Sequence, residues 1–353
     1  MRQVIKFAVA ATAASLALAA CGSSSTGSTS TNTAGSTGGN AGSGVKIGMA
    51  YDVGGRGDQS FNDAAAAGLD KAAKELGITS KEAAATNGEA ESARTERLKQ
   101  LIDAGYTNIV AVGFAYAKAV GAVAKANPNV KFAIVDDAST DSAGPNVEQI
   151  TFAENEGSFL VGAAAALKTK ANHIGFIGGV EVDLIKKFAA GYMAGAKAVN
   201  PSITIDVKYL TQPPDFSGFG SVDKGKAAAE GMYQAGADII YQAAGGSGGG
   251  VFTAAKAAGK QAIGVDSDQA ASPALADVKD VIITSMLKKV DVAVYDFIKS
   301  VKDGSFKAGN KVFDLKAGGV DYATTGGKID DIKSKLDGYK AQIIAGTITV
   351  PTK

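Results

Sequence analysis

Three residue types are scarce in this 353-residue chain, which contains no tryptophan, one cysteine (Cys21) and one histidine (His173). A single cysteine excludes an internal disulfide. A single histidine excludes a multi-histidine metal site, and any Ser-His-Asp triad would have to use His173. Because His173 directly precedes the apolar run 174–177, we interpret it as a residue at the edge of a strand. Phenylalanine and tyrosine are the only aromatic side chains on which a flat ligand could stack.

An excess of one charge is also lacking. The 36 lysines and arginines nearly balance the 35 aspartates and glutamates, and no strongly basic run occurs. A nucleic-acid partner is therefore not expected. After the N-terminal region, no stretch approaches the length of a transmembrane helix without charges.

The N-terminus predicts export. Arg2 and Lys6 precede an apolar stretch, 7–20, that is too short to span a bilayer. The stretch ends in Leu18-Ala19-Ala20-Cys21, which matches the bacterial lipobox, so residues 1–20 are expected to be a lipoprotein signal peptide and Cys21 the acylated residue. The alternative is an ordinary signal peptide with an incidental cysteine. Acyl chains on Cys21 would anchor the protein stably to the membrane.

Residues 21–44 are almost wholly Ser, Thr, Gly, Asn and Ala after the cysteine. Such a composition cannot bury enough apolar area to offset the entropy of ordering, and we expect a disordered tether with a span of roughly 25 Å. The remaining residues, 45–353, are enough for two lobes of ordinary size.

In the region 45–353, short apolar runs alternate with helical patterns, which is typical of parallel sheets flanked by helices. Predicted strands cover 45–51, 109–114, 131–136, 148–152, 174–178, 203–210, 239–243, 261–265 and 281–286. Predicted helices cover 61–76, 91–104, 116–126, 159–168, 183–199, 224–235, 251–258 and 290–301. At the first helix, Ser60 is expected to be the N-cap, Asp63 to complete a capping-box-like pair, and Gly77 to end the helix.

Four clusters follow predicted strands at the edge where open α/β sheets bind ligands. They cover residues 51–62, 135–137, 243–248 and 264–269, and three of them carry carboxylates. A single acidic residue at a strand end is usually turn chemistry. Repetition at equivalent edges predicts one shared ligand site.

Two other ligand classes fit these clusters poorly. The glycine loop that contains Asp58 lacks the third glycine of the dinucleotide fingerprint, and the loop 245–250 is followed by Val251 instead of Lys-Ser/Thr. Asp266-Ser267-Asp268 lacks the rest of a calcium loop. Carboxylates near Phe61 suit a neutral, polyhydroxylated ligand that carries a flat ring.

The same segments resemble the basic membrane protein family, which comprises substrate-binding lipoproteins of ABC transporters and includes purine-nucleoside receptors. The similarity extends from residue 45 to about residue 297. The motifs that carry it are Asp52-Val53-Gly54-Gly55, Asp58-Gln59-Ser60-Phe61-Asn62, Phe176-Ile177-Gly178-Gly179, Ile185-Lys186-Lys187-Phe188, Gly191-Tyr192, Ala244-Gly245-Gly246-Ser247-Gly248, Gly264-Val265-Asp266-Ser267-Asp268-Gln269 and the segment 284–291.

This resemblance implies a type I periplasmic-binding-protein fold, with two doubly wound α/β lobes and a ligand cleft between them. The first lobe is expected at about 45–152 plus about 287–315, and the second at about 153–286 plus about 316–353. Sequence patterns alone do not show the return of the chain to the first lobe.

The resemblance also implies roles for individual residues. Phe61 would stack on one face of a purine, and Phe219 on the other, with Phe216 as a close competitor in a loop, 213–218, that departs from the family's shorter one. The base would face Asp52 and Asn62. The residues expected to hold the ribose are Asp136, Asp266 and Lys288, with the backbone of Gly245 nearby.

We therefore expect a monomeric, lipid-anchored solute-binding protein on the extracytoplasmic face, which passes a purine nucleoside to an ABC permease without a cofactor or metal. One alternative keeps the fold and binds another flat-ring solute such as riboflavin. An enzyme such as a nucleoside hydrolase or phosphorylase would need a dense calcium-binding aspartate cluster or a basic phosphate pocket, and the sequence shows neither. A membrane-tethered sensor or adhesin is a third possibility.

Substituting Cys21→Ser tests the anchor. Because Cys21 is the only thiol and ends the lipobox, the variant should remain unlipidated and be either released or unprocessed. Membrane fractionation measures this. Retention equal to that of the wild type would contradict a lipid anchor at Cys21.

Overall fold

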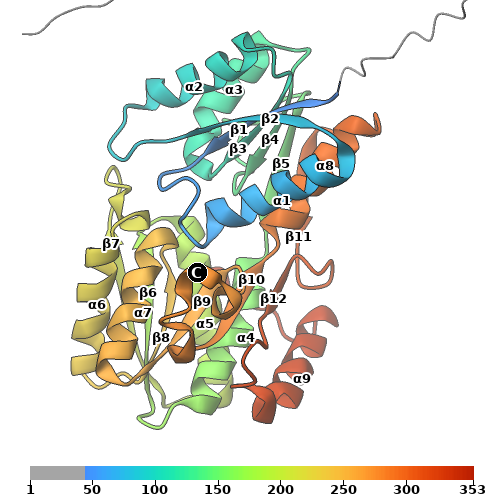
Figure 1. Ribbon diagram of the computed structural model, residues 1–353. Coiled ribbons are helices and arrows are strands. Elements are labelled where there is room, and N and C mark those ends of the chain that lie inside the picture. The colour runs from blue at the N-terminus through green and yellow to red at the C-terminus, as the bar shows by residue number, and fades with distance from the viewer. Residues whose placement is uncertain (1–43) are drawn as a thin grey trace, which may run out of the picture. The chain divides into compact units, whose positions relative to one another are not determined.

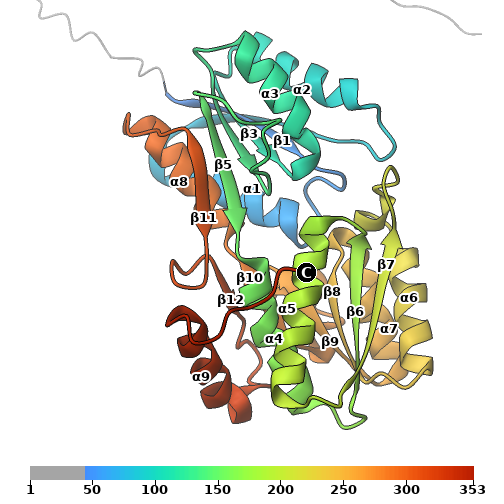
Figure 2. The same ribbon diagram turned by 180° about the vertical axis from the view of Figure 1, so that it is seen from behind.

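The computed structural model describes residues 44–353, and the predicted signal peptide, most of the predicted tether and Cys21 lie outside this range. The described residues form two six-stranded sheets, each covered by helices on both faces (Figures 1 and 2). Among these residues, no helix has both the length and the apolar character needed to cross a membrane. The predicted α/β fold class is confirmed.

The first sheet has the strand order β11-β5-β4-β3-β1-β2, and all of its neighbouring strands are parallel. Helices α1 and α8 pack together on one face, and α2 and α3 pack together on the other. We call this sheet and its helices the first lobe. Its elements are β1 (Lys46–Tyr51), α1 (Phe61–Leu76), β2 (Thr79–Ala84), α2 (Glu91–Asp103), β3 (Asn108–Val112), α3 (Ala117–Ala126), β4 (Lys131–Val135), β5 (Val147–Phe152), α8 (Val290–Lys302) and β11 (Gly309–Phe313).

The second sheet has the order β12-β10-β9-β8-β6-β7, and only the short β12 runs antiparallel to its neighbour. One face packs on α4 and α5, and the other on α6 and α7. We call this sheet and its helices the second lobe. Its elements are α4 (Glu154–Lys168), β6 (His173–Val180), α5 (Asp183–Val199), β7 (Thr204–Thr211), α6 (Val222–Gln234), β8 (Ile239–Ala243), α7 (Gly248–Ala258), β9 (Gln261–Asp266), β10 (Ile282–Lys288), β12 (Val320–Tyr322) and α9 (Lys333–Ile344).

Three crossovers join the lobes, from β5 to α4, from β10 to α8, and from β11 to β12. Figure 2 shows β5 and β11 side by side as they descend toward the second lobe. Glu156, in the first turn of α4, accepts a hydrogen bond from the backbone N–H of Leu315 at 2.8 Å, which ties the first crossover to the third. We call the end of the cleft beside the crossovers the hinge end.

Most predicted elements agree with the structure, and helices 61–76 and 183–199 have the predicted bounds. Gly77 ends α1 in the left-handed conformation, as expected. Strand β2 was missed because its sequence, TSKEAA, is polar and exposed at the edge of the sheet. The short strands β11 and β12 and the helix α9 were also missed.

Candidate functional site

A cavity lies between the lobes, at the carboxyl ends of the parallel strands. Its volume is about 60 Å³, or about 550 Å³ when all space open to solvent is included. The volume of about 60 Å³ is the one that is comparable with cavity volumes in other proteins. It leaves room for a few water molecules at roughly 10–15 Å³ each. Every predicted ligand-binding side chain or backbone lines this cavity: Asp52, Phe61, Asn62, Asp136, Phe219, Gly245, Asp266 and Lys288.

A buried ion cluster forms the hinge end of the cavity. Lys288, the last residue of β10, places Nζ 2.6 Å from Oδ2 of Asp136 and 3.3 Å from Oε1 of Glu154. The ammonium group also lies 5.0–5.4 Å from the ring centroids of Phe61, Phe152 and Phe188. Since the lysine side chain is only 1 % exposed, its charge is balanced by the protein and not by water.

Burial and neighbouring charges shift the pKa values of the carboxylates around Lys288, which can accept further hydrogen bonds. Burial raises the pKa of Asp136 to about 6 despite the attraction of Lys288, and Glu154 raises it further. Burial likewise raises the pKa of Asp266 to about 6. Burial alone would lower the pKa of Lys288, but the carboxylates of Asp136, Glu154 and Asp266 raise it above its ordinary value, so the lysine is charged at neutral pH.

One oxygen of Asp136 has no partner within the described part of the chain. Its side chain is 5 % exposed, Oδ2 is taken by Lys288, and Oδ1 is buried without a hydrogen bond. Unsatisfied buried acceptors are costly. The residue also has a positive φ of 69°, in a region that non-glycine residues rarely adopt. Both features indicate that this strand end is shaped for a ligand that donates hydrogen bonds.

The prediction that the Ser60 side chain caps α1 is wrong. Ser60 precedes α1, but its side chain makes no capping hydrogen bond. Asp58 takes the capping role, because its carboxylate accepts from the backbone N–H groups of Ser60, Asn62 and Asp63 at 2.9–3.0 Å. Asp63 accepts from the N–H groups of Gly57 and Gln59 instead of completing a capping box.

The hydroxyl of Ser60 is therefore free to reach the second lobe, where it donates to Oδ2 of Asp266 at 2.5 Å. Beside it, the carbonyl of Gln59 accepts from Gln269 Nε2 at 2.9 Å and from Ser267 Oγ at 3.2 Å. Gln59 and Asp266 both have positive φ, 57° and 64°. These bonds connect the β1–α1 loop directly to the loop after β9.

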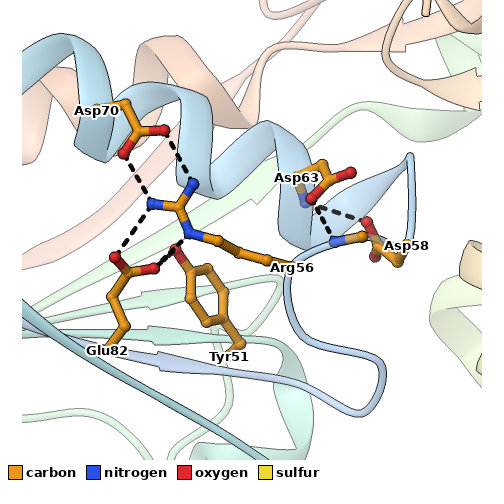
Figure 3. A network of polar contacts seen from close by, with 7 residues as sticks. Tyr51, Arg56, Asp58, Asp63, Asp70 and Glu82 are labelled. Atoms are coloured by element: carbon orange, nitrogen blue, oxygen red, sulfur yellow. Dashed lines mark hydrogen bonds and ion pairs between the residues drawn. The ribbon is translucent and has the colours of Figure 1, made fainter. Parts of the chain in front are cut away.

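The β1–α1 loop is itself held from outside the cavity by Arg56 (Figure 3). The guanidinium group bonds both oxygens of Asp70 on α1, at 2.7 and 2.9 Å, and Oε2 of Glu82 on β2 at 2.5 Å. Tyr51 donates to the same glutamate at 2.7 Å. This network braces the loop that carries Asp52, Asp58 and Phe61.

Asp52 and Asn62 lie together on the first-lobe wall. Asn62 accepts from the N–H of Asp52 at 3.0 Å and donates to the carbonyl of Val53 and to Asp58. Its amide is thus engaged in shaping the loop. The Asp52 carboxylate lies against Gly113, where a Cβ would approach Oδ2 to 2.5 Å, and burial raises its pKa to about 6.

Phe219 and Phe216, the two candidates for the second stacking aromatic residue, lie in different places. Phe219 lines the cavity, whereas Phe216 does not; its ring lies 6.1 Å, centroid to centroid, from that of Phe114. The ring of Phe219 rests on Gly179, where a Cβ would lie 2.4 Å from Cδ1 and 2.6 Å from Cε1.

The lining also includes residues that were not named individually as ligand-binding: Val53, Asp58, Ala243 and Val265, which lie inside the predicted clusters, and Gly113, Phe114, Leu184, Ile185 and Phe188, which lie outside them. Phe188 could have been found, since α5 has a clear amphipathic pattern and places it one turn from Leu184. Phe114 is the last residue of the predicted strand 109–114, but no charge or glycine repeat marks it as functional.

Strand order separates some of the charged lining residues from some of the aromatic ones, although Phe61 lies beside Lys288. At the hinge end, β4 leads to Asp136, while β10 and β9 end at Lys288 and Asp266. Away from the hinge, β3 leads to Phe114 and β7 leads to the loop that carries Phe219. A ligand with hydroxyls at one end and a flat ring at the other matches this arrangement.

Two parallel-sheet lobes with a cavity at their facing carboxyl edges form a type I periplasmic-binding-protein fold, the fold of ABC solute-binding proteins. Comparisons with known proteins agree. Residues 45–353 match the family model described as "ABC transporter substrate-binding protein PnrA-like", so the chain belongs to this basic membrane protein family of ABC transporter substrate-binding proteins.

Two relatives and one solved structure illustrate the similarity. The chain is 38% identical over 324 residues to the "CD4+ T-cell-stimulating antigen" of Listeria monocytogenes, covering 87% of this chain and 88% of that protein. It is 38% identical over 332 residues to the "ABC transporter nucleoside-binding protein BmpA" of Lactococcus lactis, covering 90% and 92%. A solute-binding protein of an ABC transporter system from Aeropyrum pernix matches with a TM-score of 0.76 and 29% identity, covering 88% of this chain and 94% of that chain.

The close packing of the Phe219 ring on Gly179 can be tested with the substitution Gly179→Ala. The new methyl group would meet the ring at 2.4 Å and the backbone of Gly218 at 3.0 Å, so overpacking should lower the free energy of unfolding by about 1–3 kcal/mol. Gly249→Ala in α7 is the matched control, because nothing lies within 4 Å of its added Cβ. Urea denaturation measures both variants, and equal stability of the two would show that Phe219 does not rest on Gly179.

Proposed function

We propose that this protein captures a purine nucleoside outside the cell and delivers it to an ABC permease. In this proposal the chain acts as a monomer that Cys21 anchors to the membrane through acyl groups. The two lobes, with the residue bounds predicted above, close around the ligand. The name of the Lactococcus relative, a nucleoside-binding protein, supports the choice of ligand.

The unpartnered Oδ1 of Asp136 is the observation on which the proposal rests. A ribose hydroxyl donating to this oxygen would satisfy a buried acceptor, and a second hydroxyl would donate to Asp266, in place of Ser60. Hydrogen bonds to ionised acceptors are stronger than those to neutral ones. Lys288 favours the ionised forms of Asp136 and Asp266 by lowering their pKa values, which burial raises.

The base would lie between Phe61 and Phe219, and the Phe61 ring centroid is 5.0 Å from the ammonium group of Lys288. Stacking on aromatic faces suits any purine, and Asp52 at the edge can accept a hydrogen bond from a ring N–H or amino group. A nucleotide is disfavoured, because its phosphate would enter a site lined by Asp52, Asp58, Asp136 and Asp266.

Ligand entry requires the cleft to open. The cavity of about 60 Å³ holds only a few waters, and the bonds from Ser60 and Gln59 bridge the lobes. A ligand that contacts both lobes favours the closed conformation by its differential contacts. Binding should therefore compact the protein.

The direct test is to identify the ligand. Mass spectrometry of small molecules released from freshly purified protein should detect a purine nucleoside, and incubation with inosine or guanosine should leave the nucleoside intact. Release of free base beyond one equivalent would contradict a binding function and support a nucleoside-processing enzyme.

Asp266→Ala should weaken the binding of a purine nucleoside, measured by calorimetry. Loss of a hydrogen bond to a charged acceptor costs about 1.5–3 kcal/mol, which is roughly a 10- to 150-fold loss of affinity. Asp268→Ala is the control: it is two residues away, bonds Thr325, and does not line the main cavity. If Asp266→Ala binds as tightly as the control, Asp266 is only a turn residue.

A further inference from the structure

The sugar end of the proposed site is fixed by the ion cluster, but that cluster sets no limit on the size of the ring system at the other end. In the first lobe, Phe114 follows β3, one strand farther from the hinge than β4, and lines the cavity. A second phenylalanine, Phe216, approaches it from the second lobe. Its ring centroid lies 6.1 Å from that of Phe114, with the planes tilted by 58°.

This pair is a contact across the cleft. Phe114 belongs to the first lobe, and Phe216 to the loop after β7 at the far edge of the second sheet. Phe216 does not itself line the cavity, and it contacts Phe114, which does. Tilted rings at this separation are within the favourable range for aromatic pairs.

The loop holds Phe216 in place through its own polar contacts. Asp215 accepts from the N–H of Ser217 at 2.8 Å and from Lys224 at 3.3 Å, and its carbonyl accepts from Thr211 at 2.6 Å. Farther along, the carbonyl of Gly218 accepts from Ser247 at 2.7 Å. Phe216 therefore lies in a turn whose two ends are held by hydrogen bonds.

We propose that Phe114 and Phe216 form an aromatic gate that limits the ligand to a two-ring base and slows its release. This inference rests on the proposed function. With the sugar held by Asp136 and Asp266, a two-ring base extends from the hinge end toward Phe114. A third ring in line with the first two would occupy the position of Phe114, so the closed gate excludes flavin-sized ring systems.

The gate also connects the lobes outside the ion cluster, through the loop that follows the edge strand β7. The lobes are held at the hinge end by Lys288 and Asp136, and in the middle by Ser60 and Asp266. Opening for release must separate the two rings of the gate. Ligand dissociation should therefore be faster when either ring is removed.

The first experiment follows release of 2-aminopurine riboside, a fluorescent purine nucleoside, by stopped flow from the full-length protein. Phe114→Ala and Phe216→Ala should each speed dissociation about 2- to 12-fold, the range expected for one aromatic pair. The double variant should be no faster than the faster single variant, because both remove the same contact. Val222→Ala is the control, since this valine is an exposed apolar residue near the same loop.

The second experiment uses riboflavin, whose fluorescence is quenched on stacking. The wild type should leave it unquenched, whereas the double variant should bind it. Melting curves verify folding, and Phe216→Leu, which keeps apolar bulk, replaces Phe216→Ala if the latter unfolds.

The outcomes of these two experiments distinguish the aromatic gate from the proposed nucleoside-binding function. Nucleoside binding by the wild type, with release rates and riboflavin exclusion unchanged in every variant, would overturn the gate and leave the proposed function intact. Tight riboflavin binding and no nucleoside binding by the wild type would overturn both.

Discussion

Lys288 is a buried cation on which the geometry of the cleft depends. It ends β10 at the second crossover, bonds Asp136 of the first lobe, and contacts Glu154 at the first crossover. Glu154 in turn accepts from Lys187 at 2.6 Å. Removing one partner of a buried ion pair typically costs about 3–5 kcal/mol, because the remaining charge is left without compensation. The cluster thus fixes where the lobes meet and favours the ionised forms of carboxylates inside a cavity.

The polarity of the site follows from that placement. Parallel strands end at one edge, and their order places Asp136, Lys288 and Asp266 toward the hinge end and Phe114 and Phe219 farther from it. Four non-glycine residues in the range 44–353 have positive φ, and three of them, Gln59, Asp136 and Asp266, are at the cleft. Such conformations cost energy and persist where the surrounding structure enforces them. Their concentration here agrees with a site shaped before the ligand arrives.

Much of this site was predictable because it depends on strand ends. Asp52, Asp136 and Asp266 each follow an apolar run, and the carboxyl edge of a parallel sheet brings such residues together. Similarity to a known family then supplied Phe61, Phe219 and Lys288. The helices with strong apolar periodicity, such as 61–76 and 183–199, were likewise predictable.

The remaining features depend on contacts between distant segments. Ser60 has the sequence signature of an N-cap, yet Asp58 performs that role and Ser60 bonds Asp266, 206 positions away. Local pattern cannot reveal a partner at that separation. Phe216 and Phe219 are three residues apart on one loop, and only the packing on Gly179 distinguishes their positions. Strands β11 and β12 are too short and too polar to show the two-residue alternation of apolar and polar side chains that indicates a strand.

The central claim is that the hinge-end carboxylates hold sugar hydroxyls, and calorimetry with two ligands tests it most directly. A purine ribonucleoside should bind the wild type at least about 100-fold more tightly than its 2′,3′-dideoxy analogue, because the analogue lacks the hydroxyls that would donate to Asp136 and Asp266. Affinities within threefold of each other would contradict the claim.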